Sequence, residues 1–252
     1  MPGADARQGR RGDSTYGFPF GIRIMCGRFT QHNEEDEFED RFNFSNPAGI
    51  LFNKRFNIAP SQNVPVVVLE EDVRLLKLMR WGLVPFWAKD ASIGYKMINA
   101  RAETITEKAS FKNILKNKRC MVPASGFYEW VKNQKKNTKT PLYFRLKSKE
   151  PFAFAGLWDK WKQLDGDTLF SFTIITTGPN ELMRPTHNRM PVILRQMDEN
   201  MWLDPELREF DKLTSLLRPY PTDLMEAYEV STIVNSPKND VPECIKPVQL
   251  GT

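Results

Sequence analysis

The stretch RCMVPASGFYEWV, residues 119–131, predicts a strand, a Ser-Gly turn and a second strand. β-Branched and aromatic residues fill both halves, and Ser125-Gly126 divides them. Runs of similar character occur on both sides of it, at 64–81, 141–147, 151–161, 169–177 and 224–232. In the first of these, two segments flank the pair Glu71-Asp72, as expected for a β-hairpin. We therefore expect a largely antiparallel sheet.

Helical patterns are short and lie between these runs. They occur at 33–42, with Asn33 as the expected N-cap, at 110–118, near 180–184 and at 206–217. The chain has no βαβ alternation and no Gly-rich phosphate loop. The sequence therefore predicts one α+β domain over residues 26–252, with a mostly antiparallel, barrel-like β core and peripheral short helices. Residues 1–25 form an N-terminal extension that we expect to be flexible.

Composition bounds the class of protein. The chain has 252 residues, of which 40% are hydrophobic and 27% charged, as in globular proteins. It has neither a long apolar run nor a signal-peptide pattern, so we expect a cytoplasmic protein, nucleoid-associated in a bacterial host, without membrane contact. The net charge of +5 permits binding to a polyanion without requiring it.

Cysteine and histidine are scarce. Cys26, Cys120 and Cys244 are widely spaced, and only two His accompany them, which matches neither a zinc site nor a disulfide framework. We expect no metal and no cofactor. Cys120 and Cys244 are expected to be reduced, buried thiols.

Two residues are candidates for proton transfer. Glu129 lies among aromatic residues; buried, its carboxyl group would suit proton transfer, whereas strict alternation would place it on a solvated face. His187 lies in a loop before an apolar strand, where either a site residue or a structural histidine fits. The other histidine, His32, is expected to be exposed before an acidic helix.

Further polar residues suit anion or substrate binding. Asn99 lies in an apolar context, where its amide either orients a substrate or belongs to a turn. Arg28, Arg101 and Arg189 each lie within two residues of another candidate; together they would form an anion site, and singly each is typical of a surface ion pair. The apolar residues of 80–90 either stack on bases or belong to the core.

Cys26 has special chemistry only at a free N-terminus. An α-amine titrates at a lower pH than a lysine amine, so much of it is unprotonated near neutrality. It can attack an aldehyde to give an imine, and the adjacent thiol can then close a thiazolidine ring. An internal cysteine lacks this amine.

Seven blocks occur in a distinctive order. They are MCGRF (25–29), RWGLVPFWAKD (80–90), NARAET (99–104), SF before RCMVPASGFYEW (110–130), FAGLWD (154–159), TIITTGPN (173–180) and HNRMPVIL (187–194). This order resembles the SRAP family, the SOS response-associated peptidases, also described as abasic-site processing proteins. The resemblance covers residues 25–194, and 195–247 fits the family's usual tail.

The resemblance implies a DNA-repair role. The family binds single-stranded DNA containing an abasic site, and its N-terminal Cys crosslinks to the ring-opened sugar as a thiazolidine. On this basis Cys26 is the nucleophile, Asn99 positions the site, and Glu129 and His187 handle protons. The protein would be an enzyme with lyase-like chemistry. Separately from the resemblance, we expect a monomer, which suits a protein that grips one lesion.

The resemblance also implies DNA contacts. Arg28, Arg101 and Arg189 match positions that contact DNA phosphates, and Trp130 follows the family's pattern near the DNA.

The start of the chain departs from the family, in which the Cys follows the initiator Met. Here 24 residues precede Met25. Either translation begins at Met25, which is then removed, or residues 1–25 are a propeptide that is cut off.

Two alternative functions stay open. One is a cysteine peptidase (hydrolase) that chiefly processes its own Met25–Cys26 bond. The other is a non-catalytic single-stranded DNA-binding module that uses the Arg and Trp residues alone.

Overall fold

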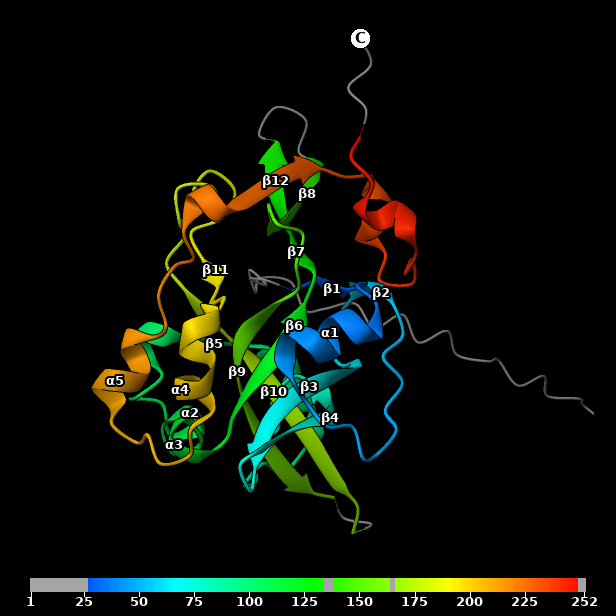
Figure 1. The fold of residues 1–252 in the computed structure, drawn as a ribbon. Coiled ribbons are helices and arrows are strands. Elements are labelled where there is room, and N and C mark those ends of the chain that lie inside the picture. The colour runs from blue at the N-terminus through cyan, green and yellow to red at the C-terminus, as the bar shows by residue number, and fades with distance from the viewer. Residues whose placement is uncertain (1–26, 134–137, 164–165, 249–252) are drawn as a thin grey trace, which may run out of the picture.

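The computed structural model describes residues 27–133, 138–163 and 166–248 (Figure 1). Cys26 and the predicted 1–25 extension lie outside the described residues.

A closed five-stranded barrel forms the centre of the fold (Figure 1). Its ring order is β10-β4-β3-β6-β9, and β9 pairs again with β10. The strands are β3 (Asn63–Glu70), β4 (Val73–Trp81), β6 (Arg119–Ala124), β9 (Phe152–Lys162) and β10 (Thr168–Thr177). Only the β4–β10 pair of the ring is parallel, which confirms the predicted mostly antiparallel barrel. Two short strands, β5 (Asn99–Arg101) and β11 (Met190–Pro191), extend the sheet beside the end of β10.

A second, five-stranded sheet lies at one end of the barrel (Figure 1). Its order is β12-β8-β7-β1-β2, and every pair in it is antiparallel. The strands are β1 (Phe29–Gln31), β2 (Arg55–Ile58), β7 (Gly126–Asn133), β8 (Thr138–Leu146) and β12 (Met225–Glu229).

Ser125 joins the two sheets. The strands on either side of it form where predicted, but they are not partners, because β6 pairs with β3 and β9 while β7 pairs with β1 and β8. The Ser-Gly pair therefore carries the chain from the barrel into the second sheet. Gly126 is required there, because a Cβ atom would lie 2.2 Å from the Tyr143 hydroxyl and 2.7 Å from the Phe144 carbonyl oxygen.

Gly126→Ala should lower the free energy of unfolding by roughly 3 kcal/mol, since part of this overlap is with backbone that must shift. Urea unfolding measures the loss. Gly178→Ala is the matched control, because a Cβ there meets nothing within 4 Å; its effect should stay within about 0.5 kcal/mol. Equal stability of the two variants would contradict this account of Gly126.

The predicted 64–81 hairpin is confirmed. Strands β3 and β4 pair in continuous register from Asn63↔Arg80 to Glu70↔Val73. Glu71 and Asp72 have φ of 49° and 64°, the two left-handed residues that a tight hairpin turn needs.

The described helices are short. They are α1 (Glu35–Phe42), α2 (Ala109–Lys112), α3 (Ile114–Asn117), α4 (Glu199–Leu203) and α5 (Phe210–Ser215), with 3-10 turns η1 (Ala91–Lys96), η2 (Ala102–Thr104), η3 (Gln196–Asp198), η4 (Thr222–Leu224), η5 (Thr232–Asn235) and η6 (Pro242–Ile245). None of these helices is long and apolar enough to cross a membrane.

Two helix predictions need correction, and one helix was missed. Glu34, in a capping box with Glu37, is the N-cap of α1 in place of Asn33. The segment near 180–184 forms turns, and α4 was not predicted.

Two main hydrophobic clusters hold these layers together. Along β3, Val64, Val66 and Val68 join a cluster that includes Phe29 and Phe127 of the second sheet. Val67, on the opposite face, joins a cluster with helices α1, α4 and α5. The barrel thus supports the second sheet on one side and the helices on the other.

Candidate functional site

Strand β1 leads directly to the candidate nucleophile. It pairs with β7 through Phe29↔Phe127, and the backbone N–H of Tyr128 donates to the Arg28 carbonyl at 3.0 Å. Continued one residue beyond the Arg28–Tyr128 contact, this antiparallel register would bring Gly27 opposite Glu129. The residue that precedes Gly27 in the sequence is Cys26.

Glu129 is buried, with 4% of its surface exposed. The solvated-face alternative is therefore wrong. Both faces of β7 are covered: Phe127 packs in the cluster shared with the barrel, and Tyr128 packs in a separate cluster with Tyr143. Alternation places Glu129 on the same face as Phe127, toward the barrel.

The same cluster brings the candidate segments together. It contains Ile98, which precedes Asn99, and Met183 and Met190, which flank the loop of His187. The fold thus gathers the segments that carry Asn99, Glu129 and His187 around one core, from β5, β7 and the loop before β11.

Asn99 begins β5 and is half-buried. Strand β5 runs parallel to β10, with Asn99 paired to Ile174 and Arg101 paired to Thr176. Asn99 therefore belongs to a strand rather than a turn, while Arg101 at the end of this strand is exposed.

His187 follows a run of turns. Its backbone N–H donates to the Met183 carbonyl at 3.0 Å, and its ring Nδ1 accepts from the Arg189 backbone N–H at 3.1 Å. An accepting Nδ1 places the proton of the neutral ring on Nε2.

Arg189 is held in place by an acidic partner. Its Nη1 donates to Glu103 Oε1 at 2.5 Å, and its Nη2 donates to the Thr176 carbonyl at 2.6 Å. Partial burial opposes ionisation of Glu103, but the hydrogen bond from Arg189 and the charges of Arg189 and Arg101 give it a lowered pKa. Of the three predicted arginines, Arg101 and Arg189 are thus brought together beside Thr176.

Arg28 is largely enclosed. Its Nη1 donates to Asn57 Oδ1 at 2.6 Å and to the Val234 carbonyl at 2.9 Å, and burial lowers the pKa of its guanidinium. Its Cζ lies 5.6 Å from the ring centroid of Trp130. Trp130 Nε1 in turn donates to Asn235 Oδ1 at 2.7 Å.

His32 is not the exposed residue that we predicted. Its ring stacks on Phe56 at 5.5 Å and its Nε2 lies 3.1 Å from the Tyr143 hydroxyl. Burial lowers the pKa of His32. The acidic helix that follows His32 in the sequence suggested an exposed position and did not indicate these aromatic partners.

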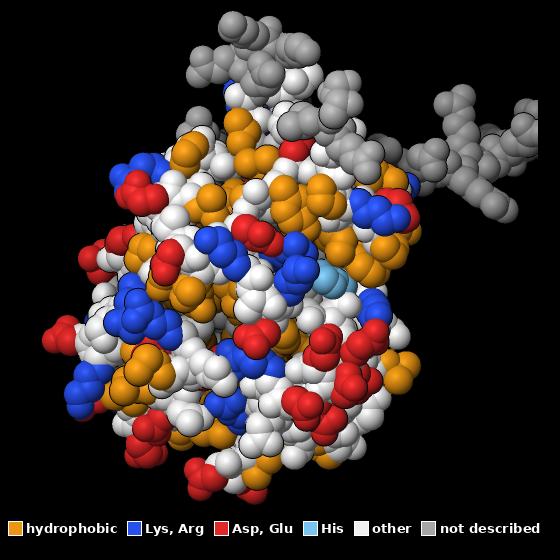
Figure 2. Space-filling model, turned by 45° about the horizontal axis from the view of Figure 1, so that its top comes forward, with side chains coloured by type: hydrophobic (Ala, Val, Ile, Leu, Met, Phe, Trp, Pro, Cys, Tyr) orange, Lys and Arg blue, Asp and Glu red, His pale blue; other side chains and the backbone are white. Residues whose placement is uncertain are grey.

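Charged side chains, and side chains of the types that bind metals, are dispersed rather than clustered. Figure 2 shows Lys and Arg side chains interspersed with acidic and hydrophobic ones on the face drawn there. Among the described residues, no group of three His, Cys, Asp or Glu is arranged to hold a metal ion. Cys120 and Cys244 are free, buried thiols.

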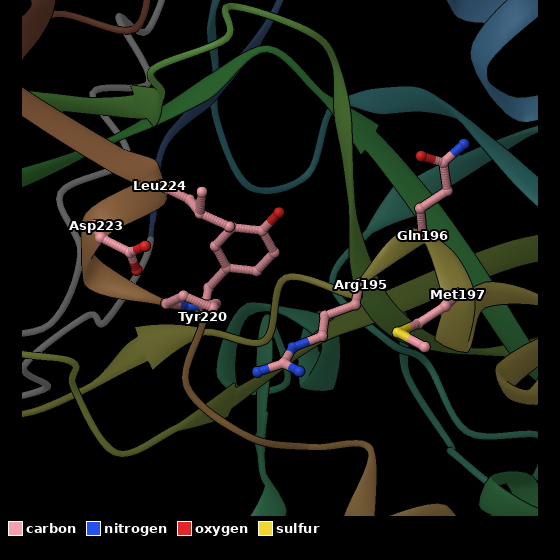
Figure 3. A pocket seen from close by; sticks show the side chains of 7 residues that line it. Arg195, Gln196, Met197, Tyr220, Asp223 and Leu224 are labelled. Carbon is pink, nitrogen blue, oxygen red and sulfur yellow. The ribbon is translucent and has the colours of Figure 1, made fainter.

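A surface pocket of about 650 Å³ lies elsewhere. Figure 3 shows its two sides, which come from the segment before α4 and from the segment around η4; its lining is Arg195, Gln196, Met197, Tyr220, Pro221, Asp223 and Leu224. None of the predicted site residues lines it.

Three polar residues near the site were missed from sequence. Glu103 lies in the NARAET block, and its position two residues after Arg101 was an available signal. The other two, Asn57 and Asp240, contact each other although they lie 183 positions apart in the sequence, and no local pattern indicated this contact.

A model of the family described as SOS response associated peptidase (SRAP) matches residues 25–237. The chain belongs to the SRAP family. The resemblance drawn from the seven sequence blocks is thereby confirmed.

SRAP relatives from a bacterium and from a vertebrate match most of this chain. "Abasic site processing protein YoqW" of Bacillus subtilis (strain 168) is 51% identical over 224 residues, covering 88% of this chain and 99% of the relative. "Abasic site processing protein HMCES" of Gallus gallus is 35% identical over 233 residues, covering 79% and 68%. A crystal structure of a Bacteroides thetaiotaomicron protein matches with a TM-score of 0.80 at 29% identity, covering 88% of this chain and 100% of that one.

Proposed function

We propose that this protein captures abasic sites in single-stranded DNA by forming a covalent thiazolidine through an N-terminal Cys26, and so shields the lesion. The observation that carries the proposal is the burial of Glu129 on β7, the strand that pairs with β1, which follows Cys26 in the sequence. Support comes from the relatives, which are named abasic site processing proteins.

The covalent step balances without a cofactor. The Cys26 α-amine adds to the aldehyde carbon of the ring-opened sugar, and water leaves to give an imine. The thiol sulfur then bonds to the imine carbon while the thiol proton moves to the nitrogen. One water is lost overall, and nothing is oxidised or reduced.

Opening the sugar requires proton transfer, because an abasic sugar is mostly a closed hemiacetal. In the proposal Glu129 and His187 perform it, since a buried carboxyl group and a ring with its proton on Nε2 can donate and accept protons. Asn99, fixed on β5, orients the sugar.

Single-stranded DNA is held by phosphate and ring contacts in this proposal. Arg101 is exposed beside Arg189, and both guanidiniums suit phosphate oxygens. Trp130, half-buried beside Arg28, offers a ring for contact with the DNA. Binding should therefore weaken as salt is raised.

Removal of residues 1–25 is part of the proposal, because any residue before Cys26 blocks its amine. The family description as a peptidase favours one hydrolytic step, in which the protein cleaves its own Met25–Cys26 bond. Initiation at Met25 followed by loss of that Met gives the same N-terminus.

The test mixes the protein with an oligonucleotide carrying one abasic site and with the matching intact strand. Two forms are compared: the chain initiated at Met1 and the chain initiated at Met25, with intact masses measured for each. A heat-stable DNA–protein band should form only with the abasic strand, and only for molecules whose mass begins at Cys26. A band of equal strength from molecules retaining Met1 would overturn the proposal.

A further inference from the structure

The C-terminal part of the chain packs against the start of β1. Residues 232–240, here called the brace, follow β12 and lie against β2. The Asp240 carboxylate accepts the Asn57 backbone N–H at 2.9 Å and also pairs with Arg55. The brace is thus bonded to the edge strand of the second sheet.

Asn57 connects the brace to Arg28. It is fully buried, and its Oδ1 accepts from Arg28 Nη1 at 2.6 Å. Its Nδ2 donates to the brace carbonyls of Asn239 at 2.6 Å and Ser236 at 3.0 Å. The amide oxygen of Asn57 therefore has a partner in Arg28, just before β1, and the amide nitrogen has its partners in the brace.

The brace also makes direct contacts. The Val234 carbonyl accepts from Arg28, and Asn235 Oδ1 accepts from Trp130 Nε1. Arg28 is one residue from Gly27, and Trp130 is one residue from Glu129. The brace therefore contacts the sequence neighbours of both Gly27 and Glu129.

We propose that Asn57 and the brace are positioning elements that hold Arg28 and Trp130, and so fix the start of β1 beside β7, the strand of Glu129. This inference rests on the proposed function, because its effect is on the crosslinking step. Asn57 touches no reacting atom; it acts through Arg28.

Loss of positioning should lower the rate of reaction more than the affinity for DNA. A displacement of about 1 Å at a reacting centre costs on the order of 100-fold in rate. Asn57→Ala should therefore lower the crosslinking rate at saturating DNA by about 10- to 100-fold, with the half-saturating DNA concentration changed by less than about 3-fold.

A milder pair of variants tests the same role in case Asn57→Ala does not fold. Asn235→Ala removes only the Trp130 acceptor and should slow crosslinking by about 5-fold, whereas Asn235→Asp keeps an acceptor oxygen and should restore the rate. Asn53→Ala, at an exposed position before β2, is the matched control and should react like the unchanged protein.

The experiment measures single-turnover crosslinking to a fluorescent abasic oligonucleotide, over a range of DNA concentrations, with protein whose mass begins at Cys26. Thermal unfolding verifies that each variant is folded. If the unchanged protein fails to crosslink, the proposed function falls and the inference falls with it. If it crosslinks and the folded Asn57 and Asn235 variants keep its rate, or differ only in half-saturating concentration, the positioning role alone is overturned. Should Asn57→Ala not fold, the Asn235 pair decides.

Discussion

Cys26→Ala will abolish the heat-stable crosslink to abasic DNA, lowering its rate by at least about 10³-fold in protein whose mass begins at residue 26. The reason is the missing sulfur: alanine keeps the α-amine, so an imine can form, but no ring can close on it. The measurement is denaturing electrophoresis after heating, at several reaction times.

Reductive trapping separates the two steps. With cyanoborohydride present, the Ala variant should crosslink through its reduced imine, while without it the band is absent. Cys120→Ala removes another thiol, one that is completely buried in the barrel, and should crosslink normally. Undiminished heat-stable crosslinking by Cys26→Ala would refute thiazolidine chemistry at this residue.

Glu129→Gln should lower the single-turnover rate by about 10²- to 10⁴-fold, the usual contribution of a positioned general acid or base. Gln has nearly the same shape and hydrogen-bonding reach, so packing around this 4%-exposed residue is retained. Its amide cannot exchange a proton with the sugar. The pH profile of the rate should also lose the limb that the carboxyl group contributes.

Glu229→Gln is the control for this effect. Glu229 lies exposed on β12 of the same sheet, so the change in charge is the same while the site is untouched. A Glu129→Gln rate within about 3-fold of the control, with an unchanged pH profile, would show that this carboxyl group is structural and leave His187 to transfer the proton.

Local pattern was enough to predict the long strands and the β3–β4 hairpin, but not the short strands β1 and β2 or the partners of the other strands. The β3–β4 hairpin follows from Glu71 and Asp72, whose turn joins strands adjacent in sequence. The crossing of the chain at Ser125 from the barrel to the second sheet depends on Tyr143, whose side chain fills the space beside Gly126. The sequence signal of a Ser-Gly turn is the same for a hairpin and for a crossing between sheets.

The candidate residues were found by chemistry and resemblance, while their surroundings were not. Sequence alternation left the burial of Glu129 open, because it does not show that both faces of β7, the face of Glu129 and the face of Tyr128, are covered. The partners of Arg28 were missed because Asn57 and Val234 come from distant parts of the chain. Such contacts are set by packing, and no local period encodes them.

The junction at Ser125 has a consequence for how the molecule opens. Strand β7 continues from a strand of the closed barrel, so amides around Glu129 should exchange with solvent only in openings that disturb the barrel. Strand β12, at the outer edge of the second sheet, has no such continuity and can exchange earlier. We therefore expect partial unfolding of the C-terminal segment to free the Arg28 and Trp130 side chains from Val234 and Asn235 while strand β7, which carries both Trp130 and Glu129, stays paired.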